Sequence, residues 1–159
     1  MALRNIVKFG DPILNKTSRK IEKFDDRLAI LIDDMLETMY KANGVGLAAV
    51  QVGMLKRVVV IDIEDGTGVK VLINPKITKT KGEQEVEEGC LSFPNQYAKL
   101  IRPKEVTVEA LDENGKKVVI KAKDLLAQAV AHELDHLDGV VFIDKMIPGT
   151  LEYVKPEQN

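Results

Sequence analysis

A single apolar stripe over residues 25–42 is the clearest periodic pattern in the chain. Its apolar side chains recur every three or four positions, which is the spacing of one face of an α-helix. They are Leu28, Leu31, Ile32, Met35, Leu36 and Met39. Asp25 or Asp26 can cap the start of this helix, and Asn43-Gly44 can end it. The pattern predicts an amphipathic N-terminal helix that follows about twenty residues of irregular chain rich in turn residues.

Beyond residue 56 the pattern changes to short β-branched runs separated by turn residues. The run Arg57-Val-Val-Val-Ile-Asp-Ile63 is typical of a strand with both faces covered. Further strands are expected over residues 69–74, 77–80, 83–88 and 105–111, with Pro75 breaking the first of them. Asn114-Gly115 separates residues 106–111 from residues 117–121 and predicts a hairpin, because both residues tolerate a positive φ.

A second helix is expected from Asp124, as its N-cap, to about Leu137, with Gly139 placed to end it. The order is therefore one helix, many strands joined by hairpins, and a last helix. Such an order favours an α+β fold with mostly antiparallel β-sheets packed around the C-terminal helix. We expect a single domain over residues 1–159, in which residues from about 150 onward form a frayed tail.

Composition and charge narrow the classes of function. Apolar residues make up 45% of the chain and charged residues 30%, as in globular proteins with an aliphatic core. The 23 basic and 25 acidic residues give a net charge of -2, which supplies no global attraction to nucleic acid or to anionic membranes. We expect neither a cleaved signal nor a membrane helix. The single cysteine excludes an intramolecular disulfide, which fits a reducing cytoplasm.

The predicted C-terminal helix carries the motif His132-Glu-Leu-Asp-His136, which holds the only two histidines of the chain. Residues four apart project from the same face of a helix, so the two imidazoles can share one cation. In sites of the HExxH type the glutamate, here Glu133, lies beside the water that the metal activates and handles its protons. Taken alone, the motif also fits two ordinary helix-surface histidines.

Cys90 is the candidate for a third ligand. A catalytic metal site usually has three protein ligands and one open position, and a thiolate with two imidazoles suits zinc or iron(II). Taken alone, a single cysteine is more often a small buried hydrophobe. Sequence spacing alone does not show that Cys90 lies near the helix, so the ligand set Cys90, His132 and His136 is a hypothesis at this point.

Three segments together resemble the ordered signature motifs of bacterial-type peptide deformylases. They are Gly44-Val-Gly-Leu-Ala-Ala-Val-Gln51, Glu88-Gly-Cys-Leu-Ser92 and His132-Glu-Leu-Asp-His-Leu137, and the early Gly10-Asp-Pro-Ile-Leu14 is also typical of that family. The resemblance implies a hydrolase that removes the N-formyl group from the initiator formyl-methionine of nascent polypeptides and releases formate. It also implies one divalent metal on Cys90, His132 and His136, natively iron(II), with zinc or nickel able to occupy the same ligands.

The resemblance assigns further roles by position. Glu133 would act as general base and then as general acid, while Gln51 and the Leu91 backbone N–H would stabilise the oxyanion. The substrate-binding residues that it implies are Val45, Gly46, Gly89, Leu125 and Ala129. The pattern departs from the family at Ala131, usually Gln, and at Gln128, a position that is often apolar.

Other implications concern partners and the surroundings of the cysteine. Glu88 and Arg102 are expected to form a pair that braces the cysteine loop. The partners implied are formyl-methionyl nascent peptides and a transient ribosome contact, with no nucleic-acid specificity, no membrane and a monomeric state.

Two alternatives compete with a deformylase. A zinc-dependent HExxH endopeptidase normally takes its third ligand from a downstream acid or histidine, for which Glu152 is available here. That choice leaves Cys90 and Gln51 without a role. A non-catalytic metal-binding protein would usually close the fourth coordination position with a protein ligand and would not need Glu133.

Overall fold

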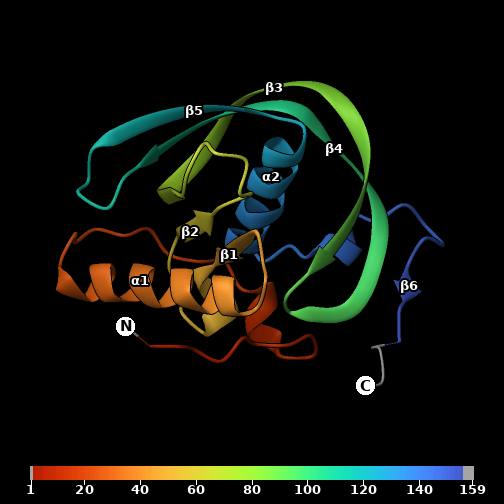
Figure 1. Cartoon of the computed structure of the whole chain (residues 1–159), viewed down its shortest axis with the longest axis horizontal. Coiled ribbons are helices and arrows are strands. Elements are labelled where there is room, and N and C mark those ends of the chain that lie inside the picture. Colours follow the sequence, from red (N-terminus) through yellow and green to blue (C-terminus); the bar gives the residue numbers. More distant parts are fainter. Residues whose placement is uncertain (1, 156–159) are drawn as a thin grey trace.

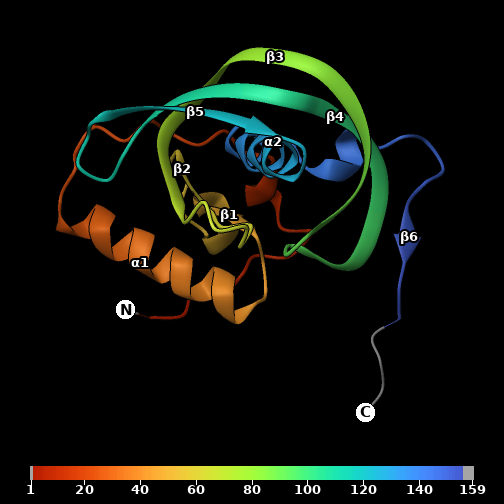
Figure 2. The same cartoon turned by 45° about the horizontal axis from the view of Figure 1, so that its top comes forward.

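Two α-helices and one antiparallel sheet build residues 2–155, the part of the chain that the computed structural model describes. Helix α2 (Leu125–Leu137) lies in the middle, beneath an arch formed by β3, β4 and β5 (Figure 1). Helix α1 (Asp26–Lys41) packs on β1 and β2, on the other side of the molecule (Figures 1 and 2). The α+β class and the antiparallel pairing agree with the sequence prediction. Within residues 2–155, no helix has the length and apolarity needed to cross a membrane.

Helix α1 begins and ends at the residues that its sequence favours. The Asp25 side chain accepts a hydrogen bond from the Leu28 backbone N–H at 3.1 Å, as an N-cap does. At the other end Asn43 adopts a positive φ of 57°, and the Gly44 N–H donates a hydrogen bond to the Met39 carbonyl. The buried stripe contacts β1 and β2 through a core that includes Leu31 and Met35.

The sheet has the order β1-β2-β3-β4-β5, and β6 pairs with β4. The strands are β1 (Gly46–Ala48), β2 (Val58–Ile61), β3 (Lys70–Cys90), β4 (Phe93–Leu111), β5 (Lys117–Lys123) and β6 (Glu152–Tyr153). Among the described residues, β1 pairs with β2 only, so its outer edge carries no strand. Short 3-10 helices cover Pro12–Asn15, Ala49–Val52 and Phe142–Asp144.

The long hairpin of β3 and β4 differs from the sequence prediction. We expected three short strands between residues 69 and 88, but one strand runs from Lys70 to Cys90 without a break at Pro75. A register shift between Ile73 and Lys76 accommodates the proline, which cannot donate to the ladder. Strand β4 likewise begins at Phe93, well before the expected residue 105, and Cys90 pairs with Phe93 where the hairpin closes.

The turn between β4 and β5 is a second correction of detail. The hairpin is present, with Leu111 paired to Lys117. Only Gly115 takes a positive φ, 80°, and its N–H donates to the Asp112 carbonyl. The loop is therefore longer than a two-residue Asn-Gly turn.

The frayed tail expected from about residue 150 is only partly correct. Glu152 and Tyr153 pair with Tyr97 and Gln96 as β6, and residues 156–159 lie outside the described part of the chain.

The start of α2 is also not as predicted. Asp124 precedes the helix, but its side chain makes no capping bond and pairs with Lys104 at 2.9 Å instead. Its backbone has a φ of 55° and a ψ of -123°, whereas an N-cap residue usually adopts an extended conformation. The end of α2 follows the prediction, because Gly139 has a φ of 74° and the Val140 N–H donates to the Asp135 carbonyl.

Candidate active site

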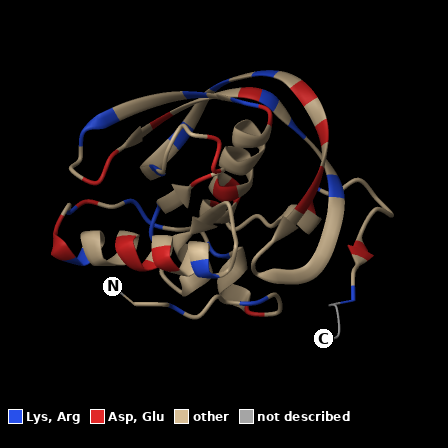
Figure 3. Cartoon of the chain, in the orientation of Figure 1, with Lys and Arg blue, Asp and Glu red and all other residues tan. Residues whose placement is uncertain are grey.

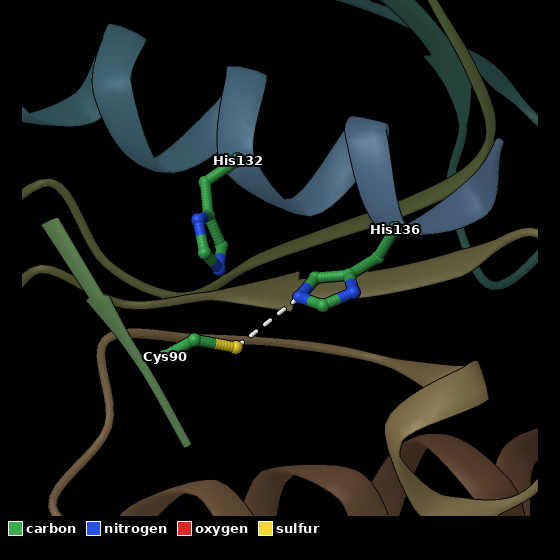
Figure 4. Close-up of side chains that lie close together, drawn as sticks. All are labelled: Cys90, His132 and His136. Carbon is green, nitrogen blue, oxygen red and sulfur yellow. Dashed lines mark hydrogen bonds between the residues drawn. The ribbon is translucent and has the colours of Figure 1, made fainter. Parts of the chain in front are cut away.

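Cys90 meets the two histidines of α2 in the interior of the molecule. Cys90 is the last residue of β3, and the Sγ atom lies 3.3 Å from His136 Nε2. One ligand atom from each of Cys90, His132 and His136 lies within 4.8 Å of the others. Figure 4 shows both rings descending from the same face of α2 toward the sulfur. The long β3–β4 hairpin therefore carries Cys90 to a helix that begins 35 residues later in the chain.

These three residues fit a divalent metal ion. One sulfur and two imidazole nitrogens are a ligand set used for zinc and iron(II). Burial lowers the pKa of His136 to about 3, so its ring stays neutral, as a metal ligand must be. Within residues 2–155 this is the one group of three or more such side chains close enough to hold an ion.

Glu88 fixes the orientation of His132. His132 Nδ1 lies 2.6 Å from Glu88 Oε2, and both side chains are buried. Burial alone would raise the pKa of Glu88, but the hydrogen bonds from His132 and Arg102 outweigh it and lower this pKa to about 2. Because an ionised carboxylate only accepts, Nδ1 must carry a hydrogen, which in the neutral ring leaves the Nε2 lone pair free for a metal.

Arg102 ties this carboxylate to two elements at once. Its Nε donates to Glu88 Oε1 at 3.0 Å and its Nη2 to Glu88 Oε2 at 2.6 Å, while Nη1 donates to Asp135 Oδ2 at 2.7 Å. The expected pair of Glu88 and Arg102 is thus present, and it is buried rather than a surface pair. Lys145 holds the other Asp135 oxygen at 3.0 Å. Strand β3, strand β4 and helix α2 are therefore linked around His132.

Glu133 points into a tight space beside β1. A Cβ atom built on Gly46 would lie 2.5 Å from Glu133 Oε2, so only glycine leaves room for this carboxylate. The Oε1 atom is buried and has no hydrogen-bond partner among the described residues. Burial raises the pKa of Glu133 to about 7, which suits a group that takes and returns a proton near neutral pH.

Gln51 presents its amide N–H₂ toward Cys90. Its Oε1 accepts a hydrogen bond from the Ala48 backbone N–H at 3.0 Å, and because that group can only donate, the amide cannot be flipped. Its Nε2 then donates to Ser92 Oγ at 3.1 Å and lies 3.5 Å from Cys90 Sγ. Gln51 is almost fully buried, so its donor is held in place beside the cluster.

A pocket of about 440 Å³ opens beside this cluster. Every site residue predicted from the sequence lines it except His136, which is fully buried behind it. The predicted substrate-binding residues Val45, Gly46, Gly89, Leu125 and Ala129 all belong to its wall. Gln128 lies in the same wall and donates to the Glu87 carbonyl at 3.2 Å.

Comparisons with known proteins agree with this arrangement. The family model described as polypeptide deformylase matches residues 3–151 of the chain. The chain belongs to the polypeptide deformylase family. The resemblance stated from the three motifs is therefore confirmed. Because the members of this family are enzymes, the chain is an enzyme of the peptide deformylase type.

Curated relatives cover almost the whole chain. Peptide deformylase 1 of Clostridium acetobutylicum is 57% identical over 146 residues, which are 92% of this chain and 96% of that protein. Peptide deformylase of Acetivibrio thermocellus is 55% identical over 147 residues, which are 92% of this chain and 85% of that protein.

Solved structures share the fold. A peptide deformylase from Legionella pneumophila superposes with a TM-score of 0.89 at 46% identity, covering 92% of this chain and 87% of that one. A peptide deformylase from Ehrlichia chaffeensis in complex with actinonin gives a TM-score of 0.90 at 38% identity, over 93% and 91%.

Several residues around the deformylase-type site escaped the sequence analysis. Asp135 lies inside the His132–His136 segment, yet its contact with Arg102 follows from the fold rather than from a motif. Ser92, which positions Gln51, ends the Glu88–Ser92 motif and could have been singled out for that reason. Tyr97 is close enough to Gly89 that an added Cβ would lie 2.8 Å from its ring, and no sequence signal indicated this contact.

Proposed function

We propose that this enzyme hydrolyses the formyl amide of N-formyl-methionyl peptides and releases formate. The observation that carries the proposal is the convergence of Cys90, His132 and His136 beside the buried carboxylate of Glu133, at one end of a pocket. The family supports it, because the curated relatives are peptide deformylases. An endopeptidase with a downstream acid as third ligand is not favoured, since Cys90 already completes the set.

Cys90, His132 and His136 would hold one divalent metal ion, with iron(II) as the native ion and zinc or nickel able to replace it. When bound, this ion supplies a Lewis acid that lowers the pKa of a water and polarises the formyl oxygen. Sulfur in the ligand set makes the site sensitive to oxidation, which fits an iron enzyme that loses activity in air. Glu88 and Arg102 keep the His132 ring oriented throughout.

Glu133 would handle both proton transfers. Its pKa of about 7 lets the carboxylate accept a proton from the attacking water and later give it to the leaving amine nitrogen. Negative charge builds on the former formyl oxygen between these two steps. The Gln51 amide and the Leu91 backbone N–H would donate hydrogen bonds to that oxygen, and the loss of one such donor typically costs about 3 kcal/mol of transition-state stabilisation.

The unpaired edge of β1 would hold the peptide. An extended chain can add to a free strand edge through main-chain hydrogen bonds, which tolerate many side chains. Val45 and Gly46 stand at this edge, and both line the pocket. The methionine side chain would enter between Leu125 and Ala129 of α2. This arrangement suits an enzyme that acts on the N-termini of many different nascent chains.

Formate release from a short formyl-Met peptide tests the proposal. Anaerobically purified wild type should release formate with about one metal ion bound per chain. Glu133→Gln should keep its metal but lose about 10²- to 10⁴-fold in turnover, because the proton carrier is gone. Cys90→Ala should lose metal and activity together. Glu85→Gln, at an exposed position of β3, is the matched control and should behave as wild type.

Two outcomes would contradict the proposal. One is substantial formate release by Glu133→Gln. The other is cleavage of an internal peptide bond by wild type, with no formate detected, which would favour the endopeptidase.

A further inference from the structure

Two rows of lysines lie on part of the outward face of β3, β4 and β5. Farther along the same side of β3 stand Glu83, Glu85 and Glu87, where these rows end. Residues opposite one another on antiparallel strands point to the same side of the sheet. The strand register gives two such rows, Lys79–Thr107–Lys121 and Lys81–Glu105–Lys123. On β4 the alternate residues Val106 and Val108 are buried in the core around α2. The lysine rows therefore face away from α2, toward solvent.

A β-bulge extends the rows along the strand. The register shift between Ile77 and Lys79 leaves Thr78 as an extra residue, so Lys76 and Lys79 point to the same side although they are three positions apart. At the other edge Lys117 on β5 reaches Glu109 on β4, with 3.5 Å between Nζ and Oε1. The same face thus continues toward the β4–β5 turn.

We call this surface the basic sheet face. Its charged residues are Lys76, Lys79, Lys81, Lys117, Lys121, Lys123, Glu105 and Glu109. Six lysines against two glutamates give it a net charge of +4. Removing these eight from the chain totals of 23 basic and 25 acidic residues leaves 17 against 23, a net charge of -6 elsewhere. Positive charge is therefore concentrated on this part of the outward face, in a chain whose total charge is slightly negative.

The lysines of the two rows are free to bind. Lys79, Lys81, Lys121 and Lys123 are exposed, and none has a carboxylate within 4.0 Å among residues 2–155. A hollow of about 500 Å³ lies over the rows, and its lining includes these four lysines, Thr107 and one acidic residue, Glu105. Figure 3 shows blue segments on β3 and β5 where the strands arch over α2, and red segments that follow farther along the arch.

We propose that the basic sheet face binds the phosphate backbone of duplex RNA. Regular rows of ammonium groups match a regular series of phosphates, and such contacts are independent of sequence. The face carries no aromatic side chain on which single-stranded bases could stack. Val119 is its one large exposed apolar side chain, and a single valine buries too little apolar area to anchor this face in a lipid surface.

The choice of RNA over DNA rests on the proposed function. An enzyme that acts on polypeptides during their synthesis works close to RNA, and A-form duplexes are bound through shape and phosphates rather than through base edges. Lysines as point charges suit such contacts. The basic sheet face is separate from the pocket, so binding of RNA leaves the entry of the peptide unobstructed.

Fluorescence anisotropy with a labelled RNA duplex of about 16 base pairs, the span of a small RNA-binding domain, tests the inference. If four lysines contact phosphates, the affinity of wild type should fall about 100-fold between 50 and 200 mM salt. The variant K79Q/K81Q/K121Q/K123Q should bind far more weakly at low salt and lose most of this salt dependence. The charge-reversed variant K79E/K81E/K121E/K123E should not bind.

The matched control is K8E/K16E/K23E/K41E, which alters four exposed lysines outside the β3–β5 sheet face and has the same net charge as the charge-reversed variant. It should bind RNA nearly as wild type does. All variants should release formate from a formyl-Met tripeptide at the wild-type rate, which separates this inference from the proposed function. The inference is wrong if wild type fails to bind at low salt, or if the control loses as much affinity as the charge-reversed variant. Tighter binding to a DNA duplex or to anionic vesicles would also overturn it.

Discussion

At the scale of single residues, close packing sets the position of the reactive groups. Glu133 has room for its carboxylate only because Gly46 has no side chain. Gln51 cannot turn, because the Ala48 N–H holds its carbonyl end. His132 is held in one tautomer by Glu88. Each constraint comes from a neighbour that takes no part in the proposed chemistry itself.

Replacement of Gly46 tests the first of these constraints. In Gly46→Ala the methyl group would lie 2.5 Å from Glu133 Oε2, so either the carboxylate or β1 must move. A displacement of this size can cost about 100-fold in turnover. We expect kcat for formate release to fall by about that factor while the metal content, measured by elemental analysis, stays unchanged.

Gly44→Ala provides the comparison for Gly46→Ala. The atom nearest to its added methyl group would be Leu91 Cδ1 at 2.6 Å, the tip of a side chain that can rotate away. We expect a much smaller loss of turnover for Gly44→Ala. Equal losses in the two variants would show that the space beside Glu133 is not the cause.

At the scale of elements, the predictions depend on how local their signals are. The helix bearing His132 and His136 could be predicted because its terminating glycine and its motif lie within a few residues of each other. The β3–β4 hairpin could not, because Pro75 is a local signal for the end of a strand and nothing local marked Phe93 as the start of β4. Bulges and pairing between distant residues overcome these local signals.

The first residues of the chain also depend on a distant element. Asp34 on α1 accepts hydrogen bonds from the Ala2 backbone N–H at 2.7 Å and from Arg4 Nε at 2.9 Å. The bond from Ala2 is the first cause of the lowered pKa of Asp34, and Arg4 adds to it against the opposing effect of burial. The ionised carboxylate thus helps to hold the N-terminal segment on the helix, together with the Thr38 hydroxyl, which accepts a hydrogen bond from the Arg4 backbone N–H at 3.0 Å.

A pH series tests this link. Because the folded-state pKa of Asp34 is depressed, its stabilising effect is present above the unfolded pKa of about 3.9 and is lost as the pH falls through the folded value. At pH 7, Asp34→Asn should lower the free energy of unfolding by about 1 kcal/mol. Urea titrations should show this gap closing as the pH falls below about 4. Asp33→Asn, at the exposed neighbouring position, should unfold with the same free energy as wild type. A difference between wild type and Asp34→Asn that persists in acid would contradict the link.

At the scale of the whole molecule, the candidate metal site joins parts that are far apart in the chain. Cys90 reaches α2 only when the β3–β4 hairpin is closed. The four-residue spacing predicted the histidine pair, whereas the meeting of Cys90 with that pair came from the resemblance to a family. No local sequence pattern specifies a contact between residues so far apart in the chain. Metal binding should therefore stabilise the fold as a unit.

Removal of the metal tests this coupling. At a free metal concentration of about 100 times Kd, binding adds about 2.7 kcal/mol to the free energy of unfolding. For a chain of this size that corresponds to a rise in Tm of about 5–10 °C. Calorimetry should show a drop of this size when a chelator is added to the loaded wild type, and little change for Cys90→Ala. An unchanged Tm, with one ion per chain verified before chelation, would contradict the coupling.

The unpaired edge of β1 has a consequence beyond peptide binding. A strand edge that offers free main-chain groups is also a template for a second copy of the protein, the usual beginning of aggregation. In this fold the edge is only three residues long and lies against a pocket wall. The short length limits such growth between copies, and an occupied pocket hides what remains. We therefore expect a peptide-like inhibitor that occupies this edge to reduce self-association of the concentrated enzyme as well as to block its pocket.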